Sequence, residues 1–209
     1  MLPRSEALPY VLPVALGAAA TASTGYELAA LAFALLATSL AAFFRDPERE
    51  SDEPSNCILS PADGIVVEVS SSDNGVEIAI FLSIFNVHVT RSPVAGQLIE
   101  WKRITGGSAM AFRSHASNNA RHRVVIESPL GKVELSLIAG ALARRVVPFV
   151  MPPKYLERGE RIALIKFGSR TELRLPIGYS AVVSVGGSVR AGKTVIAKAL
   201  ESNSHDSEA

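Results

Sequence analysis

A long apolar run near the amino terminus most constrains how this chain can fold. Residues 8–44 carry one charged side chain, Glu27, in a stretch rich in alanine and leucine. Two prolines and a glycine weaken a straight helix over residues 8–22, whereas residues 28–44 predict a cleaner helix of about 17 residues, near the lower limit for spanning a bilayer. A short polar turn separates the two segments. The sequence therefore predicts a hydrophobic helical hairpin, with residues 1–45 as a membrane-associating segment.

The cations that flank this run predict its orientation. Arg4 precedes it, and Arg45 and Arg49 follow it. Because basic residues collect on the cytoplasmic side of a membrane, both ends of the hairpin and the rest of the chain are expected on the cytoplasmic side of the cell membrane. A hairpin buried against the rest of the protein is the alternative. A cleaved signal peptide fits less well, because the run is long and is interrupted by Glu27.

The character of the chain changes after the apolar run. Residues 46–56 are charged and rich in residues that break regular structure, so they predict a linker. Short runs rich in β-branched residues follow, at residues 64–69, 76–82, 123–127 and 132–138. No alternating strand–helix repeat is present, so residues 57–200 predict a compact antiparallel β-sandwich or barrel. Residues 201–209 form a polar tail that is expected to be disordered.

Composition sets three further limits. A chain of 209 residues can bury one sizeable core. Its formal net charge of +1 gives no reason to expect a nucleic-acid partner. The single cysteine, Cys57, rules out an internal disulfide and leaves a thiolate metal site unsupported, so it is expected to be a small apolar residue at the start of a strand.

The dipeptide Gly168-Ser169 suggests a bond at which the chain cuts itself. Glycine tolerates strained backbone angles, and the serine hydroxyl lies close enough to attack the preceding carbonyl. An N→O acyl shift would give an ester, and β-elimination would leave dehydroalanine at position 169, which hydrolyses to a pyruvoyl group. Such a ketone can form a Schiff base with an amine and accept the electrons released as carbon dioxide leaves. By itself the dipeptide is more typical of a turn at a strand end.

Several short motifs accompany this dipeptide in a fixed order. They are Phe43-Phe44-Arg45-Asp46-Pro47, Ser60-Pro61-Ala62-Asp63-Gly64, the segment from Phe81 to Pro93, Ile138-Ala139-Gly140, Ala143-Arg144-Arg145, Gly159-Glu160-Arg161-Ile162 and Phe167-Gly168-Ser169. In order and spacing they resemble a short-form phosphatidylserine decarboxylase proenzyme, and they extend over more than half of the chain.

The resemblance implies a β-rich decarboxylase fold, self-cleavage between Gly168 and Ser169, and a covalent pyruvoyl cofactor made from Ser169. The implied reaction is decarboxylation of phosphatidylserine to phosphatidylethanolamine at a membrane, by long and short chains that stay associated. A higher oligomer stays open, as does an ether-linked, archaeal-type lipid in place of a diacyl lipid.

Two further residues are candidates for the chemistry. His88 suits proton transfer near neutral pH and is expected to protonate the carbanion left by decarboxylation, although its apolar neighbours also fit a structural histidine. Asp63 lies in a turn motif and, by the resemblance, would orient a histidine or polarise the Ser169 hydroxyl. Longer family members carry a second histidine for self-cleavage where this chain has Arg91, which stays protonated and cannot be a base. Either His88 serves both steps or the base lies elsewhere.

The remaining histidines and the substrate-binding residues are less well marked. His115 and His122 are weak candidates for the base, and His205 lies in the expected tail. A phosphodiester calls for cations and backbone donors. Residues 106–108, the run Arg121-His122-Arg123 and the pair Arg144-Arg145 could supply these, but each also fits a solvated loop or face. The substrate-binding residues therefore stay unknown.

Alternative functions depend on two other motifs. Residues 187–194 match the phosphate-loop pattern, but too little chain follows for a nucleotide-binding domain, so a hairpin with turn glycines is expected. The same region is similar to the turns of biotin and lipoyl carrier domains, which would make the chain a non-catalytic membrane adaptor with Lys193 as its nearest candidate lysine. A serine hydrolase is a third reading, but residues 167–171 lack the outer glycines of a nucleophile elbow.

Overall fold

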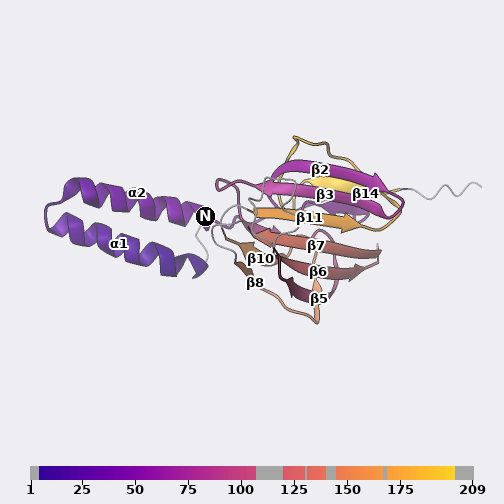
Figure 1. Ribbon diagram of the computed structural model, residues 1–209, viewed down its shortest axis with the longest axis horizontal. Helices are drawn as coiled ribbons and strands as arrows, with labels where there is room; N and C mark the ends of the chain where they lie inside the picture. Colours follow the sequence, from indigo (N-terminus) through magenta and orange to yellow (C-terminus); the bar gives the residue numbers. More distant parts are fainter. Residues whose placement is uncertain (1–4, 107–119, 130, 140–144, 167–168, 201–209) are drawn as a thin grey trace, which may run out of the picture.

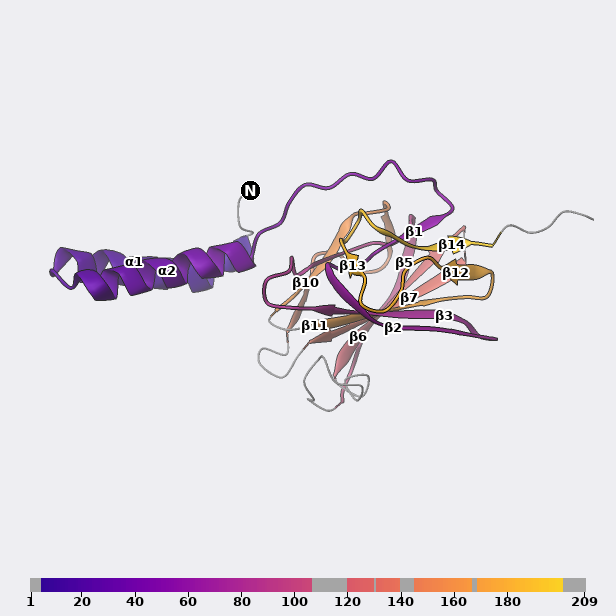
Figure 2. The same cartoon turned by 90° about the horizontal axis from the view of Figure 1, so that it is seen from above.

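The computed structural model describes residues 5–106, 120–129, 131–139, 145–166 and 169–200. A pair of long helices projects from one end of a β-rich domain (Figure 1). Seen from above, the segment after the second helix runs over the domain before the first strand begins (Figure 2). The architecture is mainly antiparallel β with an amino-terminal helical hairpin, as the sequence predicts.

The hairpin consists of a 3-10 turn, η1 (Ser5–Ala7), and the helices α1 (Leu8–Ser23) and α2 (Glu27–Phe43). Gly25 has a φ of 80° in the turn between the helices, a left-handed conformation that glycine adopts without steric cost. The hairpin is not buried against the β domain, since most of its leucines are exposed. Within the part of the chain that the structure describes, neither helix reaches the length and apolar character of a membrane span.

The β domain contains fourteen strands in the described residues. They are β1 (Cys57–Leu59), β2 (Gly64–Ser72), β3 (Gly75–Leu82), β4 (Val89–Arg91), β5 (Gly96–Ile104), β6 (Arg121–Ser128), β7 (Gly131–Ala139), β8 (Val146–Pro148), β9 (Lys154–Leu156), β10 (Arg161–Ile165), β11 (Ser169–Leu175), β12 (Tyr179–Ala181), β13 (Ser188–Val189) and β14 (Val195–Ala199). The four strands expected from β-branched runs correspond to β2, β3, β6 and β7.

The largest sheet has eight strands in the order β13-β2-β3-β11-β7-β6-β5-β9. Two smaller sheets, β1-β14-β12 and β4-β10-β8, accompany it. In the described residues the large sheet ends at β13 and β9 and does not close on itself, so the architecture is a sandwich and not a closed barrel. Strand β11 lies inside this sheet, paired along its length with β3 and β7.

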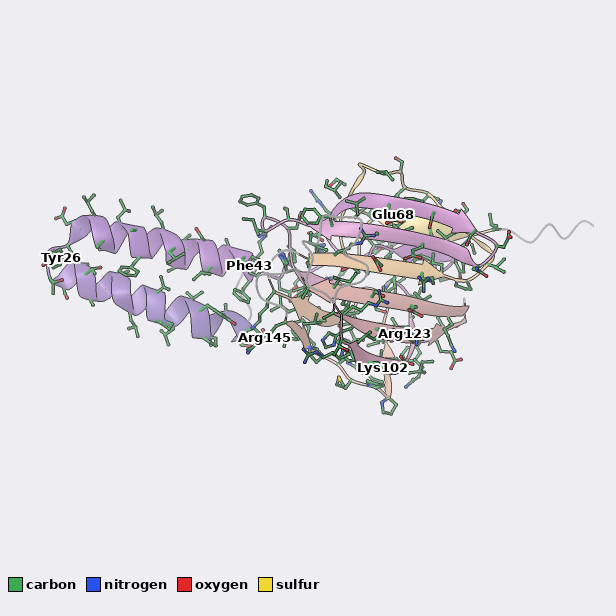
Figure 3. The ribbon with its side chains drawn as sticks, in the orientation of Figure 1. Tyr26, Phe43, Glu68, Lys102, Arg123 and Arg145 are labelled. Carbon is green, nitrogen blue, oxygen red and sulfur yellow. The ribbon has the colours of Figure 1, made fainter. Side chains whose placement is uncertain are left out.

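Buried apolar side chains form two clusters. The main core draws on all three sheets and includes Ile80, Leu82, Leu137 and Ile165. A smaller cluster, here called the hairpin-base cluster, joins the ends of the two helices to β4, β10 and the residues beside them. Its buried members are Ala7, Phe43, Phe44, Val87, Val89 and Leu164. Phe43 marks this junction in Figure 3, whereas Tyr26 marks the distant tip of the hairpin. Packing at the base therefore fixes the hairpin to the domain.

The segment 46–56 has no regular structure but is held against the domain by arginines. Arg91 donates to Asp46 and to the carbonyl of Pro47, and Arg161 pairs with both Asp46 and Glu48. Arg158 donates to the carbonyls of residues 53 and 54. The predicted linker is thus tied down along much of its length.

The phosphate-loop-like motif adopts the turn that its context predicts. Ser188–Val189 is strand β13, residues 190–194 form a turn in which Thr194 N–H donates to the Arg190 carbonyl at 3.0 Å, and strand β14 follows in place of a helix. Cys57 is buried at the first position of β1, in agreement with its predicted role as a small apolar residue.

Candidate active site

Ser169 is the first residue of β11 and is fully buried. Its register partners are Leu82 on β3 and Ala139 on β7. Directly paired residues of an antiparallel sheet point to the same face, so Ser169 shares the face of Leu82, which belongs to the main core. Its Oγ has no hydrogen-bond partner among the described residues. Buried polar atoms are usually paired, so an unpaired hydroxyl here calls for an explanation.

Two chain connections bring His88 to the same end of the molecule as Ser169. Strand β3 ends at Leu82, opposite Ser169, and residues 83–88 lead from there to β4. In the other direction, Ile165 at the end of β10 donates its N–H to the carbonyl of His88 at 3.0 Å, and the chain continues from β10 to Ser169. His88 and Ser169 are therefore linked through short segments on both sides.

The hydrogen bonding of His88 fixes its tautomer. Its Nδ1 lies 2.9 Å from the carbonyl oxygen of Asn86, and a carbonyl can only accept, so Nδ1 carries the proton. Nε2 then holds a lone pair, and it is buried without a partner among the described residues. The ring packs against Phe43 of the hairpin-base cluster, with centroids 4.3 Å apart.

Burial, and to a smaller extent the positive charge of Arg45, lowers the pKa of His88 to about 4, against the opposing effects of the Asn86 hydrogen bond and the charge of Asp63. The imidazole is therefore neutral at neutral pH. A neutral histidine with a free lone pair can accept a proton from a hydroxyl group. Among the described histidines, this arrangement makes His88 suited to activating a serine.

Asp63 lies near this site but has other partners. Both of its carboxylate oxygens bind the guanidinium of Arg49, with Oδ2 at 2.8 Å, and Oδ1 also accepts the N–H of Ala191 at 2.8 Å. Its negative charge raises the pKa of His88 through space, and the structure shows no direct hydrogen bond between these two described side chains. The predicted action of Asp63 on a histidine or on Ser169 stays a prediction, and its observed contacts are with Arg49 of the linker and with the backbone of Ala191.

Arg91, which replaces the second histidine of longer family members, has a structural environment. Its guanidinium is buried and donates to Asp46, to the Pro47 carbonyl and to the Gly159 carbonyl at 3.0 Å. His122 accepts the indole N–H of Trp101 at its Nδ1, 2.9 Å away. Both side chains are thus engaged outside the Ser169 environment.

The other sequence candidates divide into two groups. Gly168, Gly107, Ser108, His115, Arg144 and His205 lie outside the described residues. Among the described cations, Arg123 pairs with Glu100 and Glu134 on the large sheet, where Figure 3 labels it, so it is engaged within the protein. Arg145 is exposed, and its carbonyl accepts the N–H of Lys166, three residues before Ser169.

Sequence reasoning missed three side chains beside the site. Lys166 is buried, and its Nζ lies 3.2 Å from the hydroxyl of Tyr10 on α1. Phe43 covers one side of the His88 ring, and Arg45 lies close enough to affect that ring's pKa. Phe43 and Arg45 belong to one of the motifs that carry the family resemblance, and this membership could have indicated a role for them at the site. Nothing in the pattern around Lys166 indicated contact with the hairpin.

Comparisons with known proteins identify the family of this chain. The family model described as phosphatidylserine decarboxylase matches residues 36–197. A phosphatidylserine decarboxylase proenzyme of Streptomyces griseus is 41% identical over 90% of this chain and 88% of its own, and one of Streptomyces coelicolor is 42% identical over 91% and 89%. A protein of Methanosarcina acetivorans that carries an archaetidylserine decarboxylase proenzyme name is 40% identical over 74% of this chain and 73% of its own. The chain therefore belongs to the phosphatidylserine decarboxylase family.

Proposed function

We propose that this protein is a proenzyme that cleaves itself between Gly168 and Ser169 and then decarboxylates phosphatidylserine to phosphatidylethanolamine. The observation that carries the proposal is the pair of buried, unpartnered atoms, Ser169 Oγ and His88 Nε2, on segments that the fold holds together. A hydroxyl and a neutral base that can approach each other are the groups that an N→O acyl shift requires. The names of the bacterial relatives support both the cleavage and the substrate.

In the proposed cleavage, His88 Nε2 takes the proton of Ser169 Oγ while that oxygen attacks the carbonyl carbon of residue 168. The new C–O bond replaces the C–N bond, and His88 returns the proton to the departing amine of Ser169. Loss of the Ser169 α-proton then expels the carboxylate of Gly168. Water replaces the amine nitrogen, which leaves as ammonia, and the short chain begins with a pyruvoyl group.

The position of Ser169 fits such a group. A residue at the start of β11 becomes a chain terminus after cleavage, yet β11 stays paired with β3 and β7 along its length. Two further strands of the short chain pair with strands of the long chain, β14 with β1 and β13 with β2. These ladders support a stable association of the two chains. A pyruvoyl group supplies a carbonyl that binds an amine and accepts the electrons released with carbon dioxide.

Other residues would orient the substrate and move protons in the proposed reaction. Because burial lowers the pKa of His88 and keeps it neutral near pH 7, it would first have to take up a proton, which it would then readily give to the substrate carbon that has lost its carboxylate. Phe43 and the core exclude water from one side of this position. The exposed Arg145 and the buried Lys166 provide positive charge on the segment that leads to Ser169, where an anionic headgroup would approach.

We further propose that the hairpin attaches the protein to a membrane, and the cations that flank it, Arg4, Arg45 and Arg49, favour the cytoplasmic side for the β domain. Large apolar side chains project from both helices over most of their length. The exposed ones are Leu8, Leu12, Leu16, Leu28, Leu31, Phe33, Leu35 and Leu36. An exposed apolar surface of this extent is typical of membrane or protein interaction sites. Protease treatment of right-side-out and inverted membrane vesicles tests the orientation, since cleavage of the β domain only in inverted vesicles is expected.

Intact-mass analysis of the purified protein beside a Ser169→Ala variant tests the proposal. The parent is expected to give two chains, the shorter beginning at position 169 with a pyruvoyl terminus, and to release carbon dioxide from phosphatidylserine. The variant is expected to stay whole and inactive. A single uncut chain in both samples, without carbon dioxide release, would instead support the membrane adaptor.

The Methanosarcina relative favours one second candidate, an ether-linked phosphoserine lipid. The serine headgroup is common to both lipids, so the proposed chemistry at Ser169 and His88 is unchanged. Parallel assays with diacyl and dialkyl-ether phosphatidylserine distinguish the two, because a preference for one lipid would appear in kcat/KM.

A further inference from the structure

An apolar groove lies where the hairpin meets the β domain. Its walls are the last turn of α2 and the loop that follows β3, and its volume is about 480 Å³. The lining residues are Ser39, Leu40, Ala42, Phe43, Arg45, Ile84 and Phe85. This volume lies within the range of about 300–1,000 Å³ that is usual for small-molecule sites.

The outer end of the groove presents apolar side chains to solvent. Phe85 is 80% exposed and Ile84 is 56% exposed, although both are large apolar residues in a loop. This surface continues into the apolar face of α2, where Leu35 and Leu36 are exposed. A continuous apolar surface from the hairpin to the loop would meet the same lipid layer.

One wall of the groove adjoins the proposed active site. Phe43 lines the groove and also packs against His88, with ring centroids 4.3 Å apart. Phe43 therefore lies between the groove and the proposed catalytic base, which is not itself a lining residue. The groove thus lies one side chain away from the buried imidazole of His88.

A cation lies at the rim. Arg45 donates to the carbonyls of Ala42 and Phe85, so its guanidinium is anchored to both walls of the groove. Its planar head carries five N–H donors, which leaves donors for an anion. A phosphodiester is an anion that arginine binds well. The groove therefore combines an apolar channel with a positive charge, which matches the chemistry of a phospholipid.

We propose that this groove binds one acyl chain of the phospholipid substrate, with Arg45 at the phosphodiester and the serine headgroup directed toward His88 and Ser169. The inference rests on the proposed function, which it makes more specific. The cavity lined by Arg49, Arg91, Lys154, Arg158 and Arg161 is a poorer place for a chain, because its walls are mainly charged.

Photo-cross-linking tests this proposal directly. The Ser169→Ala protein is mixed with vesicles that contain phosphatidylserine with a diazirine on its acyl chain, and labelled peptides are identified by mass spectrometry. Label is expected on residues 39–45 and 84–85. An Ala42→Trp substitution, which fills the groove, is expected to lower the labelling of residues 84–85 at least fivefold. Ala32→Trp adds the same side chain at an exposed position of α2 outside the groove and is expected to leave that labelling unchanged.

Label confined to residues 8–36 would overturn the proposal, as would equal labelling of residues 84–85 in both tryptophan variants. Labelling that falls as protein concentration rises would instead indicate that a second copy covers the groove. Self-cleavage of each tryptophan variant in the Ser169 background shows that it folds. If the parent releases carbon dioxide but residues 84–85 stay unlabelled, the groove proposal alone fails. If these residues are labelled but no carbon dioxide forms, the groove is a lipid site and the proposed reaction is wrong.

Discussion

The large sheet and the base of the hairpin differ in what their buried residues contact. Around β11, apolar side chains such as Leu137 and Leu173 fill the main core, and β11 itself is paired on both sides. The hairpin-base cluster is smaller, and beside it lie a histidine with an unpaired nitrogen and a groove open to solvent. The comparison teaches that the large sheet buries an unpaired hydroxyl, that of Ser169, inside a fully paired ladder, whereas the hairpin base places an unpaired imidazole nitrogen beside an opening to solvent.

The largest expected effect concerns the two described histidines, one in each region. His88→Ala removes the proposed base and is expected to slow self-cleavage by about 10²- to 10⁴-fold. His122→Ala removes a partner of Trp101 on the large sheet and is expected to change the rate by less than about twofold. A time course of chain cleavage after synthesis measures both rates. If the His122 variant cleaved itself more slowly than the His88 variant, the catalytic base would be assigned to the large sheet instead.

The second prediction compares burial in the sheet with exposure on the hairpin. Leu137→Ala empties part of the main core and is expected to lower the free energy of unfolding by about 2–5 kcal/mol. Leu35→Ala changes a side chain that is 61% exposed. It is expected to alter the free energy of unfolding by less than about 0.5 kcal/mol. Urea unfolding in the uncut Ser169→Ala background measures both values without chain dissociation. Equal losses would show that the hairpin is part of the core.

The pH dependence of stability follows from the neutral state of His88. Its pKa is lowered to about 4 in the folded protein, from 6.5, so the unfolded chain binds more protons between these values. The contribution of His88 to the free energy of unfolding is therefore fully present near pH 7. It decreases by about 3 kcal/mol as the pH falls from 6.5 toward 4. His88→Gln is expected to remove that share of the loss. Unfolding curves at several pH values, again in the Ser169→Ala background, measure the difference between the two proteins. Parallel pH profiles would mean that His88 is not buried as described.

The smallest effects concern ion pairs. Arg49→Met leaves Asp63 buried with only the Ala191 N–H, and is expected to cost about 2 kcal/mol because the lost bonds are charge-assisted. Arg174→Met breaks a pair with Glu77 in which the arginine is 58% exposed, and is expected to cost less than about 1 kcal/mol. Thermal unfolding of the uncut variants ranks them. The reverse order would show that the linker contact contributes little.

Much of the fold could be predicted because its signals are local. The β-branched runs indicated β2, β3, β6 and β7, and the apolar run indicated both helices. The order of these strands in the large sheet could not be predicted, because β11 lies between β3 and β7 through contacts between distant parts of the chain. Ser169 and His88 were identified from motifs, whereas the partners of Asp63 required the position of the linker.

By itself the sequence determined the helical hairpin, the β class of the domain and the family, since periodicity, composition and ordered motifs are properties of neighbouring residues. Only the tertiary structure decided that Arg49 holds Asp63, that Phe43 covers His88, and that Phe43 also lines a groove between α2 and the loop after β3. The physical reason is that burial and pairing depend on which distant segments pack together. The same packing desolvates His88, and that desolvation lowers its pKa.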